Sequence, residues 1–143
     1  MLDLDGVDLA RDSRALRVVK EETVAVAFAV GDGIVTSEVG PNHYRAGDAL
    51  VTGSTGDRWC VSRARFEARY EPLPGVAAGA GGAYRSRPLI VLARQMHEPF
   101  SIARRAGGDC LHGVAGDWVM QYAPGDYGVV ERTRFARVYR AAD

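Results

Sequence analysis

The chain has 143 residues, of which 47% are hydrophobic and 25% charged, the proportions of a globular protein. Its 18 basic residues balance 18 acidic ones, so there is no net field to favour duplex nucleic acid as a partner. No apolar run approaches the roughly 20 residues that cross a bilayer, and the acidic N-terminus is unlike a signal peptide, so we expect no membrane partner and a cytoplasmic location.

The start of the chain predicts an acidic extension followed by a strand-rich module. The extension covers residues 1–22, and weak periodicity predicts a short helix over residues 8–19. Apolar runs bounded by turn residues predict four strands, over residues 23–30, 34–39, 49–52 and 59–61. Ser62 is a suitable N-cap for the short helix that follows. These elements form module 1, residues 23–73.

A linker and a second module of the same kind come next. Residues 74–87 are rich in Gly and Ala and predict a connection with little preferred structure. Beyond it, strands are predicted over residues 88–93, 100–102, 118–122 and 127–130. A short helix over residues 133–139 completes module 2, residues 88–143.

The sequences of the two modules repeat. Residues 46–70 align with residues 115–139 without a gap at an offset of 69, with 10 identities in 25 positions. At an offset of 66, residues 24–27 also align with residues 90–93. A repeat predicts equivalent folding units, and a unit of about 50 residues buries too little surface to be stable alone. The predicted fold class is therefore α+β and β-dominated: two tandem β-β-β-β-α modules, as antiparallel sheets or small barrels, packed with pseudo-twofold symmetry.

Most of the repeated residues predict structural roles. Glycine accepts the positive φ of tight turns, and an aspartate after it accepts backbone N–H bonds. A Phe and a Tyr four residues apart lie on one face of a short helix and can anchor a core. The predicted structural residues are Gly47, Asp48, Gly56, Asp57, Phe66, Tyr70, Gly116, Asp117, Gly125, Asp126, Phe135 and Tyr139.

Repeated arginines and nearby aromatic residues raise a binding hypothesis. The arginines could pair with the turn aspartates of their own module, or could bind an anion across a pseudo-twofold groove. The aromatic residues could stack on a nucleobase, or could serve sheet packing or an oligomer interface. For a small anionic or nucleotide-like ligand, the candidate residues are Arg63, Arg132, Trp59, Tyr127 and Trp118.

Two histidines repeat as well. His43 and His112 align at the offset of 69, four residues before the repeated Gly-Asp, and Cys110 adds a thiol beside the second. These three are the candidate metal ligands, although their spacing matches no recognised zinc motif, and a coincidence of two loop histidines is the preferred explanation. No phosphate loop or nucleophile motif is present. The sequence therefore leaves open whether the protein is an enzyme, and it identifies no cofactor.

The second copy carries a recognisable motif. Pro124-Gly125-Asp126-Tyr127-Gly128, with Gly116-Asp117-Trp118 upstream and Phe135 and Tyr139 downstream, resembles the bacterial and phage proteins named for a PGDYG motif. The resemblance covers residues 88–140 well. It covers residues 23–72 more loosely, because the signature there reads Thr55-Gly56-Asp57-Arg58-Trp59. It implies tandem copies of a small module and implies nothing about a reaction.

Three functions are compatible with these features. The leading hypothesis is a non-catalytic small-ligand-binding or assembly protein built from the duplicated module, because turn and core residues repeat while catalytic ones do not. One alternative is a small metal-assisted enzyme that uses the loop histidines. The other is a homo-oligomerisation or protein-interaction unit that pairs through exposed strand edges.

Overall fold

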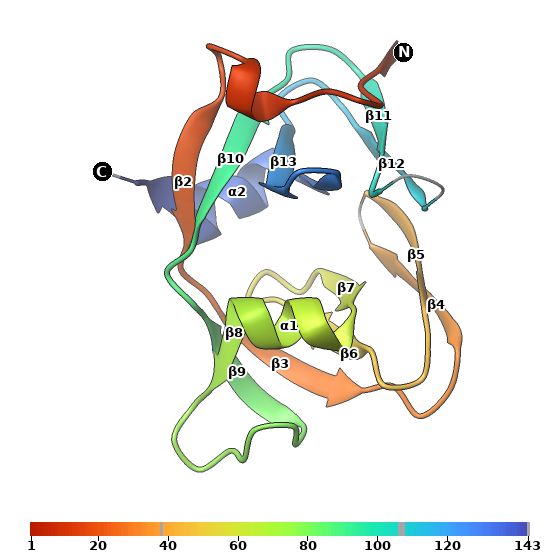
Figure 1. Ribbon diagram of the computed structural model, residues 1–143, viewed down its shortest axis with the longest axis vertical. Coiled ribbons are helices and arrows are strands. Elements are labelled where there is room, and N and C mark those ends of the chain that lie inside the picture. Colours follow the sequence, from red (N-terminus) through yellow and green to blue (C-terminus); the bar gives the residue numbers. More distant parts are fainter. Residues whose placement is uncertain (38, 106–107, 143) are drawn as a thin grey trace. The chain divides into compact units, whose positions relative to one another are not determined.

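The structure is a computed structural model that describes residues 1–37, 39–105 and 108–142 (Figure 1). Strands dominate it, and the chain divides into two compact units. Unit 1 combines Met1–Val19 with Ile90–Asp143, and unit 2 is Lys20–Leu89. This division differs from the predicted modules, because the expected extension and the expected linker both contribute strands to the units.

Unit 2 is built on a five-stranded antiparallel sheet. Its elements are β3 (Thr23–Phe28), β4 (Gly33–Ser37), β5 (Gly40–Tyr44), β6 (Ala49–Thr52), β7 (Arg58–Val61), α1 (Arg63–Arg69), β8 (Tyr70–Pro72) and β9 (Gly82–Ser86). The strand order is β7-β6-β3-β9-β8, and β4 pairs with β5 as a separate hairpin. The predicted linker therefore contains β9, which pairs with the central strand β3.

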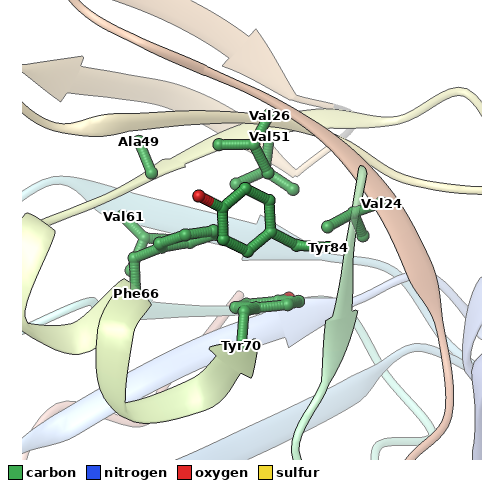
Figure 2. Close-up of a cluster of buried hydrophobic side chains, with 8 residues drawn as sticks. All are labelled: Val24, Val26, Ala49, Val51, Val61, Phe66, Tyr70 and Tyr84. Carbon is green, nitrogen blue, oxygen red and sulfur yellow. The ribbon is translucent and has the colours of Figure 1, made fainter. Parts of the chain in front are cut away.

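The main core of unit 2 lies between this sheet and α1. Figure 2 shows the rings of Phe66, Tyr70 and Tyr84 together, with small aliphatic side chains from β3, β6 and β7 around them. Phe66 stacks on Tyr70 with ring centroids 5.0 Å apart, and Tyr84 meets Phe66 edge-on at 4.9 Å. The Tyr84 hydroxyl donates to the carbonyl of Ala80 at 2.7 Å and accepts the N–H of Gly79 at 3.2 Å. Tyr84 thus anchors the loop between β8 and β9 to the core.

Unit 1 contains a second five-stranded sheet and a three-stranded one. Its elements are β1 (Leu2–Asp3), the 3₁₀ helix η1 (Leu9–Arg11), β2 (Leu16–Lys20), β10 (Ile90–Gln95), β11 (Phe100–Ala103), β12 (Cys110–Gly113), β13 (Trp118–Ala123), β14 (Asp126–Val130), α2 (Arg132–Val138) and β15 (Tyr139–Ala141). The sheet orders are β14-β13-β10-β2-β15 and β1-β11-β12. The helix predicted over residues 8–19 is wrong: only one 3₁₀ turn forms there, and β2 is recruited as a strand by pairing with β10.

Unit 1 has apolar side chains packed on both faces of its larger sheet. On the α2 face, buried Val18, Ala93 and Met120 contact the half-buried rings of Trp118 and Phe135. On the other face, the most deeply buried side chains come from β11, β13 and η1, and include Leu9, Phe100, Ile102 and Val119. The N-terminal segment therefore contributes directly to a core.

The larger sheets of the two units have matching strand orders. Reading each order from one edge, β7, β6, β3, β9 and β8 correspond to β14, β13, β10, β2 and β15. Val26 faces Val51 across β3 and β6, and Ala93 faces Met120 across β10 and β13. The structural equivalence of β3 and β10 is therefore shifted by one residue from the predicted alignment at an offset of 66.

The hairpins next to these sheets share a ring-over-glycine pair with its members exchanged. In unit 2, the Tyr44 ring on β5 covers Gly33 on β4, where an added Cβ would lie 2.4 Å from the Tyr44 hydroxyl. In unit 1, the Phe100 ring on β11 covers Gly113 on β12, where an added Cβ would lie 2.3 Å from the ring. Either strand of the hairpin can thus supply the ring, provided that the other supplies the glycine.

Candidate functional site

The repeated turn aspartates bind backbone N–H groups in both units. Asp48 Oδ2 accepts the N–H of Arg45 at 2.9 Å, and Asp117 Oδ2 accepts the N–H of Val114 at 3.0 Å. Asp117 is buried and also accepts the N–H of Arg132, the first residue of α2, at 3.2 Å. The glycines that precede these aspartates, and those at the hairpin turns, all have positive φ. These side chains organise turns.

Two of the predicted ligand-binding residues, Trp118 and Arg132, lie beside one turn of unit 1. The Trp118 ring stacks on Phe135 with centroids 3.8 Å apart and planes at 6°, and Phe135 stacks on Tyr139 at 5.0 Å. Arg132 is exposed and runs along Gly116, where an added Cβ would lie 3.0 Å from Arg132 Cδ. The half-buried stack of aromatic rings that begins with Trp118 and the aliphatic part of the Arg132 side chain therefore lie beside the same turn.

Tyr127 faces the other side of the sheet. Trp118 is paired with Val130, and Gln121 with Tyr127, so alternation along β13 and β14 puts Tyr127 opposite Trp118. Its hydroxyl donates to the carbonyl of Val7. Tyr127 thus fastens the N-terminal segment of unit 1 and lies on the opposite face of the sheet from Trp118.

The remaining two predicted ligand residues belong to unit 2. The Arg63 guanidinium lies 4.0 Å from the centre of the Phe28 ring, and its Nε donates to Glu67 at 3.1 Å on the next turn of α1. Trp59 packs against the unit 2 core and carries the ammonium of Lys20 over its ring at 4.7 Å. These contacts account for Arg63 and Trp59 within their own unit.

A buried charged cluster in unit 2 was missed by sequence reasoning. Lys20 Nζ donates to the Tyr70 hydroxyl at 2.7 Å and lies 3.4 Å from Glu22 Oε1. The Glu22 side chain is fully buried, and its Oε2 accepts the N–H and the hydroxyl of Ser54 at 2.9 and 2.8 Å. A buried ion pair needs such additional hydrogen bonds to offset its lost hydration. The only signal in the sequence is that Lys20 is the sole lysine.

The cluster has a clear structural role. It ties together the end of β2, the β6–β7 turn and the start of β8. Each named carboxylate and ammonium already has partners among these residues, and the Tyr70 ring is buried. The arrangement therefore serves to hold these elements in place.

The predicted metal ligands lie on exposed strands of different units. His43 is on β5 in unit 2, opposite Ile34, and His112 is on β12 in unit 1, opposite Ser101. Cys110 is two residues before His112, so the two side chains share a face of β12. Across residues 1–37, 39–105 and 108–142, no group of three or more His, Cys, Asp or Glu side chains could hold a metal ion.

Two carboxyl groups in unit 1 have lowered pKa values. The backbone N–H and the guanidinium of Arg14, together with the nearby Arg94, hold the pKa of Asp12 below its ordinary value. Burial opposes ionisation of Glu131, but the N–H groups of Arg134 and Thr133, the Thr133 hydroxyl and the charge of Arg132 together lower the pKa of this N-cap residue. Asp12 also pairs with Arg94 on β10 at 2.9 Å, so it joins the segment after η1 to the sheet. Glu131 caps the start of α2.

Comparison with known proteins gives one assignment. In the described part of the chain, the helices are too short and polar to pass through a bilayer. A search of curated proteins found no significant match, and a search of solved structures found none either. The model of the family described as PGDYG protein matches residues 40–140, which run from β5 into β15 and include the repeated Gly-Asp turns of both units. Since this match covers well over half of the chain, the protein belongs to the PGDYG family.

Proposed function

We propose that the protein is a non-catalytic binding protein built from a duplicated module, and that its ligand is a small planar anion, such as a nucleotide. The observation that carries this proposal is the half-buried column of Trp118, Phe135 and Tyr139 beside the exposed Arg132. We call these four residues the Trp118 corner. The ring surface offers stacking, and the guanidinium offers a charge-assisted hydrogen bond.

The duplication is supported by backbone bonds that recur at equivalent positions. The N–H of Ala29 donates to Asp48 O at 2.8 Å, and the N–H of Gly47 donates to Ala29 O at 2.8 Å. In unit 1, the N–H of Met96 donates to Asp117 O and the N–H of Gly116 donates to Met96 O, also at 2.8 Å. Unrelated turns would have no reason to share this pattern together with the same strand order.

The binding surface is supported by a contrast between equivalent rings. Phe66 and Tyr70 in unit 2 are 1% and 4% exposed, whereas Phe135 and Tyr139 in unit 1 are half-buried. Trp118 replaces Ala49 at the equivalent position, which adds a large ring where unit 2 has a methyl group. An added tryptophan that remains partly accessible provides ring surface on which a base can stack.

A titration with nucleotides tests the proposal. Purified protein in the Trp59→Phe background, which leaves Trp118 as the only tryptophan, is titrated with nucleoside mono-, di- and triphosphates while its fluorescence and melting temperature are followed. We expect quenching and a raised melting temperature with at least one of them. Arg132→Gln should weaken that binding about tenfold, as the loss of one charge-assisted hydrogen bond predicts.

Arg137→Gln is the matched control, since Arg137 is exposed on the same helix but lies at its other end. It should leave the affinity within about twofold, as expected for a distant exposed charge. No response to any nucleotide, or equal effects of the two variants, would remove the Trp118 corner as the binding surface.

A further inference from the structure

In each unit, one strand of the larger sheet comes from the stretch of chain that leads directly into the other unit. In the chain, β2 directly precedes β3, yet β2 pairs with β10, where Val18 faces Val91. Likewise β9 directly precedes β10, yet β9 pairs with β3, where Tyr84 faces Val24. The two strands are thus exchanged between the two halves of the chain. This observation does not depend on the proposed binding function.

The exchanged strands are equivalent to each other. Both lie between the central strand and the last strand of their sheet, in the orders β3-β9-β8 and β10-β2-β15. Val18 and Tyr84 both belong to the core beneath the helix. Each strand is joined to the next by a short connection, Glu21–Glu22 after β2 and Arg87–Leu89 after β9.

We infer that the chain is an intramolecular strand-exchanged dimer of two copies, residues 16–72 and 82–141. The open side of the central strand in each copy is a docking site for one particular partner, the first strand of a second copy. This is recognition by strand addition, in which main-chain hydrogen bonds supply affinity and side-chain packing supplies specificity.

The local sequence explains why β2 does not fold back onto β3. At the observed register, Thr23 faces Arg85, whose equivalent in β2 is Val19. A return hairpin would therefore have to turn within the three residues Lys20, Glu21 and Glu22. Three-residue hairpin loops need a residue with positive φ, which favours Gly or Asn. Neither is present, and no non-glycine residue in the described ranges has positive φ.

Side-chain contacts also hold the first connection in its crossing conformation. Ser86 Oγ accepts the N–H of Glu22 at 2.9 Å and donates to the carbonyl of Lys20 at 2.9 Å. The Ser86 N–H donates to the carbonyl of Glu22, also at 2.9 Å. The end of β9 is therefore bound directly to the segment that leads from β2 into β3.

Cutting the full chain between the copies tests the inference. A site for a sequence-specific protease is inserted between Ala77 and Ala78, at the exposed part of the β8–β9 loop. The uncut protein should keep the stability of the parent. After cutting, we expect the two fragments to elute together at the volume of the intact protein. After separation in urea they should recombine one to one. Fragments that separate under native conditions would overturn the inference.

Two variants of the cut protein test the exchanged strands themselves. Proline removes an N–H from a strand and is excluded from sheet interiors, so Tyr84→Pro and Val18→Pro should each weaken fragment association at least about tenfold. Arg17→Ala, an exposed change on the same strand as Val18, should leave it within about twofold. Amide hydrogen exchange in the uncut parent gives a readout that needs no variant: β2 and β9 should be protected as strongly as β3 and β10. Rapid amide exchange in β2 or β9 would contradict strand donation. So would an affinity between the fragments that neither proline variant lowers.

Discussion

In unit 2 the larger sheet is closely packed on the face under α1, whereas in unit 1 it is packed on both faces and the rings under α2 stay partly accessible. Beneath α1, Phe66 and Tyr84 are almost fully buried, while Ala25 and Ala27 on the other face of β3 are exposed. In unit 1, Phe100 is fully buried on the far face, and the rings beneath α2 are half-buried.

The difference originates in segments outside the repeated motif. In unit 2, the β8–β9 loop covers the helix face and is held there by Tyr84. In unit 1, η1 covers the opposite face, where the N–H of Leu9 donates to Gln121 Oε1 at 2.6 Å. Equivalent sheets therefore acquire different accessible surfaces from the non-equivalent segments that cover them, and only unit 1 keeps an accessible aromatic column.

The largest expected effect separates the two repeated phenylalanines. Phe66→Ala should lower the free energy of unfolding by about 3–5 kcal/mol, as for a fully buried ring. Phe135→Ala should cost about half as much, because its ring is partly solvated and its loss leaves a smaller cavity. Urea unfolding of both variants measures the difference. Equal losses would show that the rings beneath the two helices are equally enclosed in solution.

The second effect concerns the cover of unit 1. Gln121→Ala removes the acceptor for the N–H of Leu9 and the donor to Asp8, so it should cost about 1–3 kcal/mol. Amide exchange across Leu9–Arg11 should accelerate. Thr52→Ala, at the equivalent position of unit 2, should cost less than about 1 kcal/mol. Unchanged exchange in η1 would mean that Gln121 does not hold it.

A third comparison uses the turn aspartates. Asp117 accepts two N–H groups and is buried, so Asp117→Ala should cost about 1–3 kcal/mol. Asp48→Ala should cost about 0.5–1 kcal/mol, since Asp48 is partly exposed and accepts the N–H of Arg45. Thermal unfolding measures the loss of stability in both variants. A larger loss in Asp48→Ala than in Asp117→Ala would contradict the difference in burial between the two carboxylates.

The smallest effect is a pH dependence in unit 1. The folded pKa of Asp12 lies below its ordinary value of 3.8, so its stabilising contribution is present above that value and is lost as pH falls through the folded pKa. Asp12→Asn should therefore lower the melting temperature at neutral pH, and the difference from the parent should shrink in acid. Glu98→Gln, an exposed change, should give no such pattern. A difference that is constant across the acid range would rule out Asp12 as its source.

Local signals were sufficient for the β6–β7 and β13–β14 hairpins and for α1 and α2, but not for β5 and β12, which were not predicted. The Gly-Asp turns, the apolar runs at residues 23–30 and 118–122, and the Phe-Tyr spacing on each helix correspond to elements that form. These features depend on residues close together in the sequence, where turn chemistry and periodicity act directly.

Features that depend on distant partners were not accessible in this way. β2 and β9 form because they pair with strands far along the chain, so their own sequences predicted a helix and a linker. The offset of 66 between β3 and β10 was wrong by one residue, which moves every side chain to the other face of the sheet. The same cause hid Lys20 and Glu22, whose partners lie on β8 and on the β6–β7 turn.

The order of the two connections has a consequence for synthesis on the ribosome. Residues 20–89 emerge as one uninterrupted stretch and can complete unit 2 while the rest of the chain is still being translated. Val18, already made, must wait for Val91 before it has a partner. β2 is therefore made early but paired late, and a nascent chain exposes that strand throughout the interval.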